Sequence, residues 1–379
     1  LHLLIPANHK DVNLCKTMLS AAVAGFPTPT LINWGQDFSD EKLVAGGSHL
    51  AKISGVLEYL RTLGPERDDD LLLLVDGYDI WFQLRPSSVV TRFHDINAAA
   101  NARIRQAMGT RAMGDIRQEI IFSAQKRCWP WKANDPPCYA VPESSLPKDI
   151  YGPQTDTDIG FEKNPYVKFR QRYLNSGDAM GRVGALKKLF ERAMVEADKD
   201  RNFGSDQKIF SGIFGAQEVG REAMTRNLGF LQRIADWVRG RKSEGVNGEN
   251  EFGIGLDYAS LLGHPTVFAE EDSAWVKHSD LADIAKASKE LEISPVRVDG
   301  NLASDIVSSR PPFRLDAPLP GADFPAETAW RDVPLYTNMW TGVIPGLIHH
   351  NAHRDGLKSL RVSVWDRMWY FGRARTIYE

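Results

Sequence analysis

The chain has 379 residues, of which 42% are hydrophobic and 25% are charged, as in an ordinary globular protein. Lys plus Arg total 46 and Asp plus Glu total 49, and the formal net charge of −3 excludes the strongly basic character of most nucleic-acid-binding proteins. No stretch approaches the roughly 18–20 continuous apolar residues of a membrane-spanning helix. The length allows one large α/β domain or two smaller ones, with a substantial core in either case.

Apolar, strand-like segments alternate with helical segments through the first third of the chain. The predicted strands cover 1–7, 29–35, 71–75 and 119–124, and the predicted helices cover 11–24, 48–63 and 86–104. This alternation indicates a mostly parallel sheet with right-handed crossovers. Neither GxGxxG after the first strand nor GxxxxGK[ST] is present, so a dinucleotide fingerprint and a P-loop are not supported.

The rest of the chain is less regular. Residues 128–165 carry seven prolines, which predicts a long loop over the sheet. The elements expected after it are helices over 184–200 and 205–215, the second capped by Ser205 or Asp206, an exposed insertion over 239–252, and strands over 265–269 and 343–350. The aromatic carboxy-terminal segment VSVWDRMWYFGRARTIYE is expected to dock on the domain.

The three cysteines differ in their surroundings. Cys128 and Cys138 bracket the loop CWPWKANDPPC, which a disulfide could close in an oxidising compartment, with two free thiols as an equal alternative. Cys15 lies in an apolar helical pattern and is expected to be a buried free thiol.

The apolar run LLLLV at 71–75 leads directly into two aspartates, Asp76 and Asp79. Ligand sites of α/β sheets lie at the carboxyl ends of strands, where two converging carboxylates can bind a divalent cation such as Mn²⁺ or Mg²⁺. On spacing alone, a strand-ending turn with Asx hydrogen bonds is the alternative.

Three histidines fall within five positions of LIHHNAHRDG, at 347–356. No HExxH and no paired CxxC accompany them, so a zinc site is not indicated. If one histidine joins Asp76 and Asp79, the set suits Mn²⁺ bridging a diphosphate. A partly exposed polar loop is the alternative.

Several polar and aromatic residues suit a bound sugar or nucleotide. Asn175 and Ser176, in a glycine-flanked turn, can hydrogen-bond a polar ligand, and Asp206 can bind a sugar hydroxyl or a metal-bound water. Trp129 and Trp131 can stack on a sugar or a base. Taken singly, each is better explained as a turn, a helix cap or a core aromatic.

Together these motifs resemble a known family. In the order strand–DxxD, FSAxxxCWP, YLNSG, DQ and HxN, they are similar to the glycosyltransferase domain of the procollagen lysyl hydroxylases and related collagen glycosyltransferases. The resemblance implies a GT-A fold, in which a Rossmann-like, mixed but mostly parallel sheet is flanked by helices, with long loops over the active site. It also implies a UDP-sugar donor and Mn²⁺, with Mg²⁺ as the alternative ion.

The resemblance assigns roles residue by residue. Asp76, Asp79 and His349 match the metal ligands, and His350 is the competing choice for the histidine. The positions that match the donor site are Gly46, Gly47, Lys52, Asp76, Asp79, Trp129, Asn175, Ser176 and Asp206. Gly46, Gly47 and Lys52 belong to the nucleotide side of that site.

Three departures from the family pattern leave the catalytic base open. Gln125 replaces an acidic residue, Asp178 replaces a glycine, and an acidic run shrinks to Ser205–Asp206. Asp178 and Asp206 are the candidates for a carboxylate that deprotonates the acceptor hydroxyl in an inverting enzyme. A retaining enzyme would not need a base so placed.

The resemblance implies a single glycosyltransferase domain over 1–379. It comprises a nucleotide-binding half (1–125), an acceptor and metal half (126–360) and a docking segment (361–379). The expected reaction moves glucose or galactose from a UDP-sugar to a hydroxyl group of a protein or glycan.

The expected compartment is the lumen of the Golgi or endoplasmic reticulum. The start LHLLIPANHKD lies inside a predicted strand, so we expect a trimmed amino terminus and a membrane attachment, if any, through a segment outside this sequence. Two other functions remain alternatives: a non-catalytic nucleotide-sugar-binding module, which Gln125 favours, and a metal-dependent hydrolase, which would need a second metal.

Overall fold

The computed structural model describes residues 1–38, 42–44, 47–108, 116–160, 164–200, 202–227, 250–312, 328–352, 358 and 360–371. Its helices are α1 (Val12–Ala24), α2 (Ser48–Thr62), α3 (Pro86–Met108), α4 (Pro136–Tyr139), α5 (Val183–Ala197), α6 (Asp206–Asn227), α8 (Leu281–Glu290), α9 (Ser304–Val307) and α10 (Leu360–Ser363). Its strands are β1 (His2–Pro6), β2 (Thr30–Ile32), β3 (Leu71–Val75), β4 (Ile80–Phe82), β5 (Ile120–Gln125), β6 (Tyr173–Arg182), β7 (Ile254–Asp257), β8 (Gly263–Pro265), β9 (Ser273–Lys277), β10 (Pro334–Asn338) and β11 (Leu347–His349).

The main sheet has six strands in the order β2-β1-β3-β6-β5-β7. Strand β6 is antiparallel to both of its neighbours, β3 and β5, and the other pairings are parallel. The predicted mixed, mostly parallel sheet flanked by helices is therefore confirmed. Within the described residues, no helix combines the length and apolar character that crossing a membrane requires.

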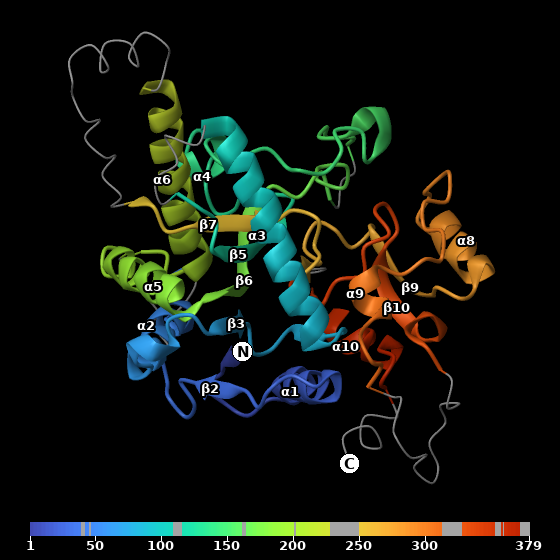
Figure 1. Cartoon of the computed structure of the whole chain (residues 1–379), viewed down its shortest axis with the longest axis horizontal. Coiled ribbons are helices and arrows are strands. Elements are labelled where there is room, and N and C mark those ends of the chain that lie inside the picture. Colours follow the sequence, from blue (N-terminus) through green and yellow to red (C-terminus); the bar gives the residue numbers. More distant parts are fainter. Residues whose placement is uncertain are drawn as a thin grey trace.

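Both faces of the main sheet are covered, which explains the unbroken apolar run of β3. Leu72 and Leu74 belong to a core with residues of α2, α5 and α6, whereas Leu73 and Val75 belong to a second core with residues of α1 and α3. Figure 1 shows α3 crossing one face of the sheet, with α5 and α6 to one side of it. A strand buried on both faces needs apolar residues at every position, and LLLLV supplies them.

Two smaller sheets complete the fold. Strand β11 lies between β4, to which it is antiparallel, and β8, to which it is parallel, and β9 pairs with β10. Strands β9 and β10 lie on the side of the molecule away from α5 and α6 (Figure 1). Strands β4, β9 and β10 were not predicted from the sequence, because their pairings join segments that lie far apart in the chain.

Three expectations about local structure were wrong. The segment 265–269 is not a strand: β8 ends at Pro265, and the chain turns where the backbone N–H of Thr266 bonds to the carbonyl of His349 (2.9 Å). Cys15 is a free thiol but exposed, because the buried stripe of α1 runs through positions 13, 14, 17, 20, 21, 23 and 24 and leaves position 15 outside it. Asn175 and Ser176 lie inside strand β6 rather than in a turn.

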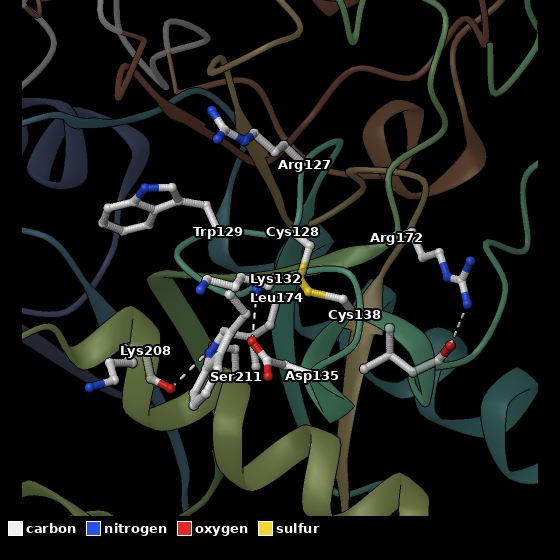
Figure 2. Close-up of a disulfide and its surroundings, with 12 residues drawn as sticks. Arg127, Cys128, Trp129, Lys132, Asp135, Cys138, Arg172, Leu174, Lys208 and Ser211 are labelled. Atoms are coloured by element: carbon white, nitrogen blue, oxygen red, sulfur yellow. Dashed lines mark hydrogen bonds between the residues drawn. A yellow bond between two sulfur atoms is a disulfide. The ribbon is translucent and has the colours of Figure 1, made fainter. Parts of the chain in front are cut away.

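The long proline-rich segment after β5 is fixed by a disulfide. Cys128 and Cys138 are bonded, with their Cα atoms 5.6 Å apart, and Figure 2 shows the Trp129 ring directed away from the bond. Apart from helix α4 and a short 3-10 turn at Gly152–Gln154, the described part of residues 128–165 has no helix or strand, as predicted.

The described part of the carboxy-terminal aromatic segment docks on the fold, as expected. Trp369 and Tyr370 are buried in a cluster with Trp81 of β4 and residues of β10 and β11. The indole N–H of Trp369 donates to the carbonyl of Gln83 (3.1 Å). Gly46, residues 239–249 of the predicted insertion and residues 372–379 lie outside the described residues.

Candidate metal centre

The DGYD turn joins β3 to β4 and carries Asp76 and Asp79. It lies at the carboxyl end of β3, beside β1, where the chain order reverses across the sheet (β2-β1-β3). A Cβ atom on Gly77 would lie 2.4 Å from the carbonyl oxygen of Pro6, so only glycine lets the turn approach the end of β1 this closely. The turn therefore lies at the position in the strand order where open α/β sheets commonly bind their ligands.

Strand β11 brings His349 to this turn. Its pairing with β4 sets His349 opposite Ile80, next to Asp79. One ligand atom from each of Asp76, Asp79 and His349 lies within 4.8 Å of the other two. His350 points elsewhere, with its ring centroid 4.0 Å from that of Trp81, so the doubled histidine contributes one residue to the cluster.

The imidazole of His349 is oriented as a metal ligand would be. Its Nδ1 lies 3.2 Å from Oδ1 of Asn175, and its Nε2 faces Oδ1 of Asp79 at 3.4 Å and Oδ2 of Asp76 at 3.7 Å. Nε2 is buried and has no hydrogen-bond partner. An amide that fixes one ring nitrogen while the other faces two carboxylates is the usual environment of a metal-binding histidine.

Strand β6 makes room for this ring. A Cβ atom on Gly177 would lie 1.9 Å from Cε1 of His349, so any larger residue would displace the imidazole. The pairing of β5 with β6 is irregular here, because Phe122 and Ser123 are opposite Ala179 and Asn175. The NSG sequence is thus an irregular stretch of a central strand, which is why it resembled a turn.

The electrostatics of Asp79 and His349 are coupled. Burial opposes the charged form of both groups, but each stabilises the charge of the other. As a result the pKa of Asp79 lies below its usual range and the pKa of His349 lies above its usual value. Lys358, whose Nζ lies 2.6 Å from Oδ2 of Asp79, lowers the pKa of Asp79 further but opposes the rise in the pKa of His349.

Lys52 forms the opposite flank of the cluster. Its Nζ donates to Oδ1 of Asp76 (2.7 Å), to the carbonyl of Ser176 (2.8 Å) and to Oδ2 of Asp206 (2.9 Å). Burial opposes the ammonium charge, but Asp206 and Asp76 outweigh it, so the pKa of Lys52 is raised. Every proton of this ammonium is used, which fixes Lys52 in place.

The two candidate bases occupy different environments. Asp206 is paired with Lys52 and lies 3.4 Å from Nδ1 of His49, and although burial opposes its charge, Lys52 and His49 lower the pKa of Asp206. Asp178 lies behind the cluster, where its Oδ2 accepts from the Ser123 hydroxyl (2.7 Å), and burial raises its pKa to about 6. Both side chains are almost fully buried.

The remaining predicted residues lie around this cluster in different ways. Trp129 is exposed on the disulfide loop, whereas Trp131 is half-buried and donates its indole N–H to Ser211 of α6 (2.8 Å). Gln125 accepts from the side-chain amide of Asn175 (2.8 Å). Gly47 is the residue before α2, and its carbonyl accepts from the N–H of Ala51 in the first turn of that helix (3.1 Å).

Sequence reasoning missed three residues of the site. Lys358 pairs with Asp79, His49 faces Asp206, and the side-chain oxygen of Gln207 accepts from the backbone N–H of Ser176 (2.8 Å). Gln207 belongs to the DQ motif, so its position was visible in the sequence. Lys358 and His49 carry no local signal, since only the tertiary fold brings them near their partners.

Comparison with models of known protein families gave no match, and comparison with curated proteins gave none either. The chemistry of the cluster is therefore judged on its own residues. Two carboxylates and one imidazole, with an unpaired buried nitrogen facing the carboxylates, fit a divalent cation such as Mn²⁺, which accepts both oxygen and imidazole ligands.

Proposed function

We propose that the protein is a metal-dependent glycosyltransferase of the GT-A type. It would move glucose or galactose from a UDP-sugar to a hydroxyl group of a protein or glycan acceptor. The observation that carries this proposal is the convergence of Asp76, Asp79 and His349 at the carboxyl end of β3, next to β1. The motif resemblance supplies the donor class.

In this proposal Asp76, Asp79 and His349 hold Mn²⁺ or Mg²⁺. When bound, the ion supplies positive charge that offsets the charge on a departing diphosphate. Asn175 fixes the tautomer and orientation of His349 through its contact with Nδ1 (3.2 Å). Lys52 holds Asp76 in position and keeps a second positive charge beside the diphosphate.

The proposed donor site extends from this centre over the residues that match the family. Gly47 and Lys52 lie on the nucleotide side, in the half that covers 1–125, and Asn175, Ser176 and Trp129 lie on the sugar side. Asp206 acts by fixing Lys52, with which it is paired at 2.9 Å. Asp178 is the remaining candidate base, and its raised pKa of about 6 suits a group that accepts a proton near neutral pH.

One observation favours a second function, that of a non-catalytic nucleotide-sugar-binding module. Gln125 stands where the family has a carboxylate, and its amide is locked between Asn175 (2.8 Å) and the carbonyl of Arg127 (2.7 Å). A two-metal hydrolase has less support, since the described residues form a single cluster of metal-ligand type.

The disulfide supports the proposed location. A Cys128–Cys138 bond persists in an oxidising compartment, such as the lumen of the endoplasmic reticulum or Golgi. No nucleic-acid partner is proposed, since the net charge is −3.

The test is hydrolysis of UDP-glucose and UDP-galactose, which transferases often catalyse slowly without an acceptor. UDP release that requires Mn²⁺, stops on adding a chelator and is absent in Asp79→Ala would support a transferase. Binding of UDP with Mn²⁺ but no turnover of either sugar nucleotide, with or without acceptors, would favour the binding module.

A further inference from the structure

Arg127 and the aromatic rings of Tyr166 and Phe268 form a cationic cluster near the candidate metal centre, called the Arg127 cluster below. Its guanidinium Cζ lies 5.5 Å from the ring centroid of Tyr166 and 5.8 Å from that of Phe268, and the two rings meet edge to face at 5.2 Å. The arginine is exposed, and no carboxylate of the described residues is in ion-pair contact with it. A cation held by aromatic rings but not neutralised is available to an anion.

Two chains of hydrogen bonds connect this cluster to His349. The side-chain amide of Gln125 donates to the Arg127 carbonyl (2.7 Å) and accepts from Asn175 (2.8 Å), which contacts His349. On the other side, the N–H of Val267 donates to Asn351 (3.0 Å), two residues from His349. Hydrogen bonds through Gln125 and Asn175 therefore connect the Arg127 segment, which follows β5, to the metal centre.

The backbone of Phe268 is strained in a way that serves this cluster. Its φ is +63°, a left-handed conformation that bulky residues rarely adopt and that costs on the order of 1–3 kcal/mol. The side chain of Asn164 holds it there by donating to the Phe268 carbonyl (3.0 Å). The strain places an aromatic ring beneath an exposed guanidinium, which packing alone does not require.

Two acidic groups that follow Phe268 in the chain have partners of their own. Asp272 is paired with Lys126 (2.8 Å), and Glu271 accepts from the side-chain amide of Asn164 (3.0 Å). A second stacked cation lies in the same segment as Tyr166, since Nζ of Lys168 is 4.4 Å from the ring centroid of Trp340.

The exposed ring of Trp129 lies two residues from Arg127. It is 41% exposed, and Figure 2 shows that Trp129 and Arg127 both point away from the disulfide. An aromatic face suits the apolar face of a sugar ring, and a guanidinium fork suits a carboxylate with two parallel hydrogen bonds. Together the two side chains match a sugar that carries a carboxylate.

We propose that Arg127, supported by Tyr166 and Phe268, binds the carboxylate of an acidic sugar in the acceptor. This inference rests on the proposed glycosyltransferase function and names the acceptor class. Arg127 selects the acceptor and takes no part in donor or metal binding.

The test compares two probes that differ only in the carboxylate, p-nitrophenyl β-glucuronide and p-nitrophenyl β-glucoside. Each is titrated into the full chain saturated with UDP and Mn²⁺. We expect the wild type to bind the glucuronide about tenfold more tightly, and Arg127→Gln to lose this preference while binding UDP normally. Arg117→Gln is the matched control, because Arg117 is an exposed arginine near the opposite end of β5 and pairs with Glu119 (2.9 Å); it should keep the preference.

Several results would overturn the inference. Equal binding of the two probes by the wild type, or a preference that survives in Arg127→Gln, would leave the acceptor neutral, with the proposed transferase intact. Weaker UDP binding in Arg127→Gln would place this residue on the donor. Arg127-dependent binding of an aspartate-flanked serine peptide, without binding of the glucuronide, would replace the sugar by a peptide. Failure of the wild type to bind UDP with Mn²⁺ would instead remove the proposed function itself.

Discussion

The two lysines that flank the candidate metal centre are held very differently. Lys52 is 5% exposed and donates to Asp76, Asp206 and the Ser176 carbonyl. Lys358 is 33% exposed, and the one ion pair it makes within the described residues is with Asp79. Both place a positive charge on a carboxylate of the cluster, but only Lys52 is enclosed on every side.

The charge of Lys52 is therefore fixed in place, whereas the charge of Lys358 can be exchanged for that of a bound cation. A cation that enters between Asp79 and His349 competes with Lys358 for Oδ2 of Asp79, whereas Lys52 binds Asp76 from the far side and can stay. Loss of Lys358 leaves Asp79 with His349 beside it (3.4 Å), whereas loss of Lys52 removes a cation that two carboxylates share and leaves an uncompensated buried charge. The comparison therefore predicts opposite consequences for the two lysines.

Replacing Lys52 should produce the largest effect on stability. Lys52→Met leaves the buried Asp206 and the half-buried Asp76 without their shared cation, which should cost about 3–5 kcal/mol of unfolding free energy. Denaturant unfolding measures this, with Lys358→Met as the matched control, which should lose less stability because Asp79 keeps His349 at 3.4 Å. Similar losses in the two variants would contradict the comparison.

Replacing His349 and His350 one at a time tests which of these adjacent histidines is the metal ligand. His349→Ala should weaken Mn²⁺ binding by at least about 100-fold, since outer-shell changes alone typically cost 10–100-fold. His350→Phe should leave Mn²⁺ binding unchanged, because His350 packs against Trp81 and neither of its ring nitrogens has a hydrogen-bond partner. Calorimetric titration of Mn²⁺ into each variant measures both, and loss of binding only in His350→Phe would reverse the assignment.

Asp257 is a buried carboxylate that, unlike Asp79 and Asp206, has no ion pair within the described residues. Its Oδ2 accepts from the N–H of Leu262 (2.6 Å), its Oδ1 has no hydrogen-bond partner, and burial raises its pKa to about 6. Since the folded pKa exceeds the unfolded value of about 3.9, its contribution is fully present below about pH 4 and is lost as pH rises through about 6.

Asp257→Asn should remove the loss of folding stability that the wild type shows as pH rises through about 6. The variant should match the wild type near pH 3.5 and be more stable by about 1–3 kcal/mol at pH 7.5. Thermal unfolding across this range checks it. A wild type whose stability does not fall relative to the variant between these pH values would show that Asp257 has an ordinary pKa.

The smallest effect is expected on the affinity of Lys358→Met for Mn²⁺ in the absence of nucleotide. Lys358→Met removes the cation that competes for Asp79, so Mn²⁺ alone should bind about 3- to 10-fold more tightly, or up to about 1.4 kcal/mol. Titration of Mn²⁺ without nucleotide is the measurement. Unchanged or weaker binding would mean that Lys358 does not compete for the metal carboxylates.

The elements that could be predicted from the sequence are those whose pattern is local. LLLLV indicated a central strand, and the aspartates at its end met a histidine from a distant strand, as expected. The strands β4 and β8 were not predicted, because each forms by pairing with β11, which lies far from both in the chain. The antiparallel entry of β6 between β3 and β5 likewise depends on tertiary structure.

The candidate site shows the same limit. Lys52 and Asp206 were both identified as donor-site residues, but their pairing across 154 positions was not. Lys358 was missed, because a lysine in a polar loop looks like a solvated charge until the fold brings it 2.6 Å from Asp79. Spacing identifies candidate ligands, whereas the charges that balance them come from packing.

The most direct test of the central claim is calorimetric titration of UDP, with and without Mn²⁺, into the wild type and Asp79→Ala. Asp79 is buried between His349 and Lys358, so its loss should remove the metal while the sheet stays folded. The account predicts UDP binding that requires both Mn²⁺ and Asp79. Binding of UDP that is equally strong without the metal or without Asp79, or no binding at all, would contradict it.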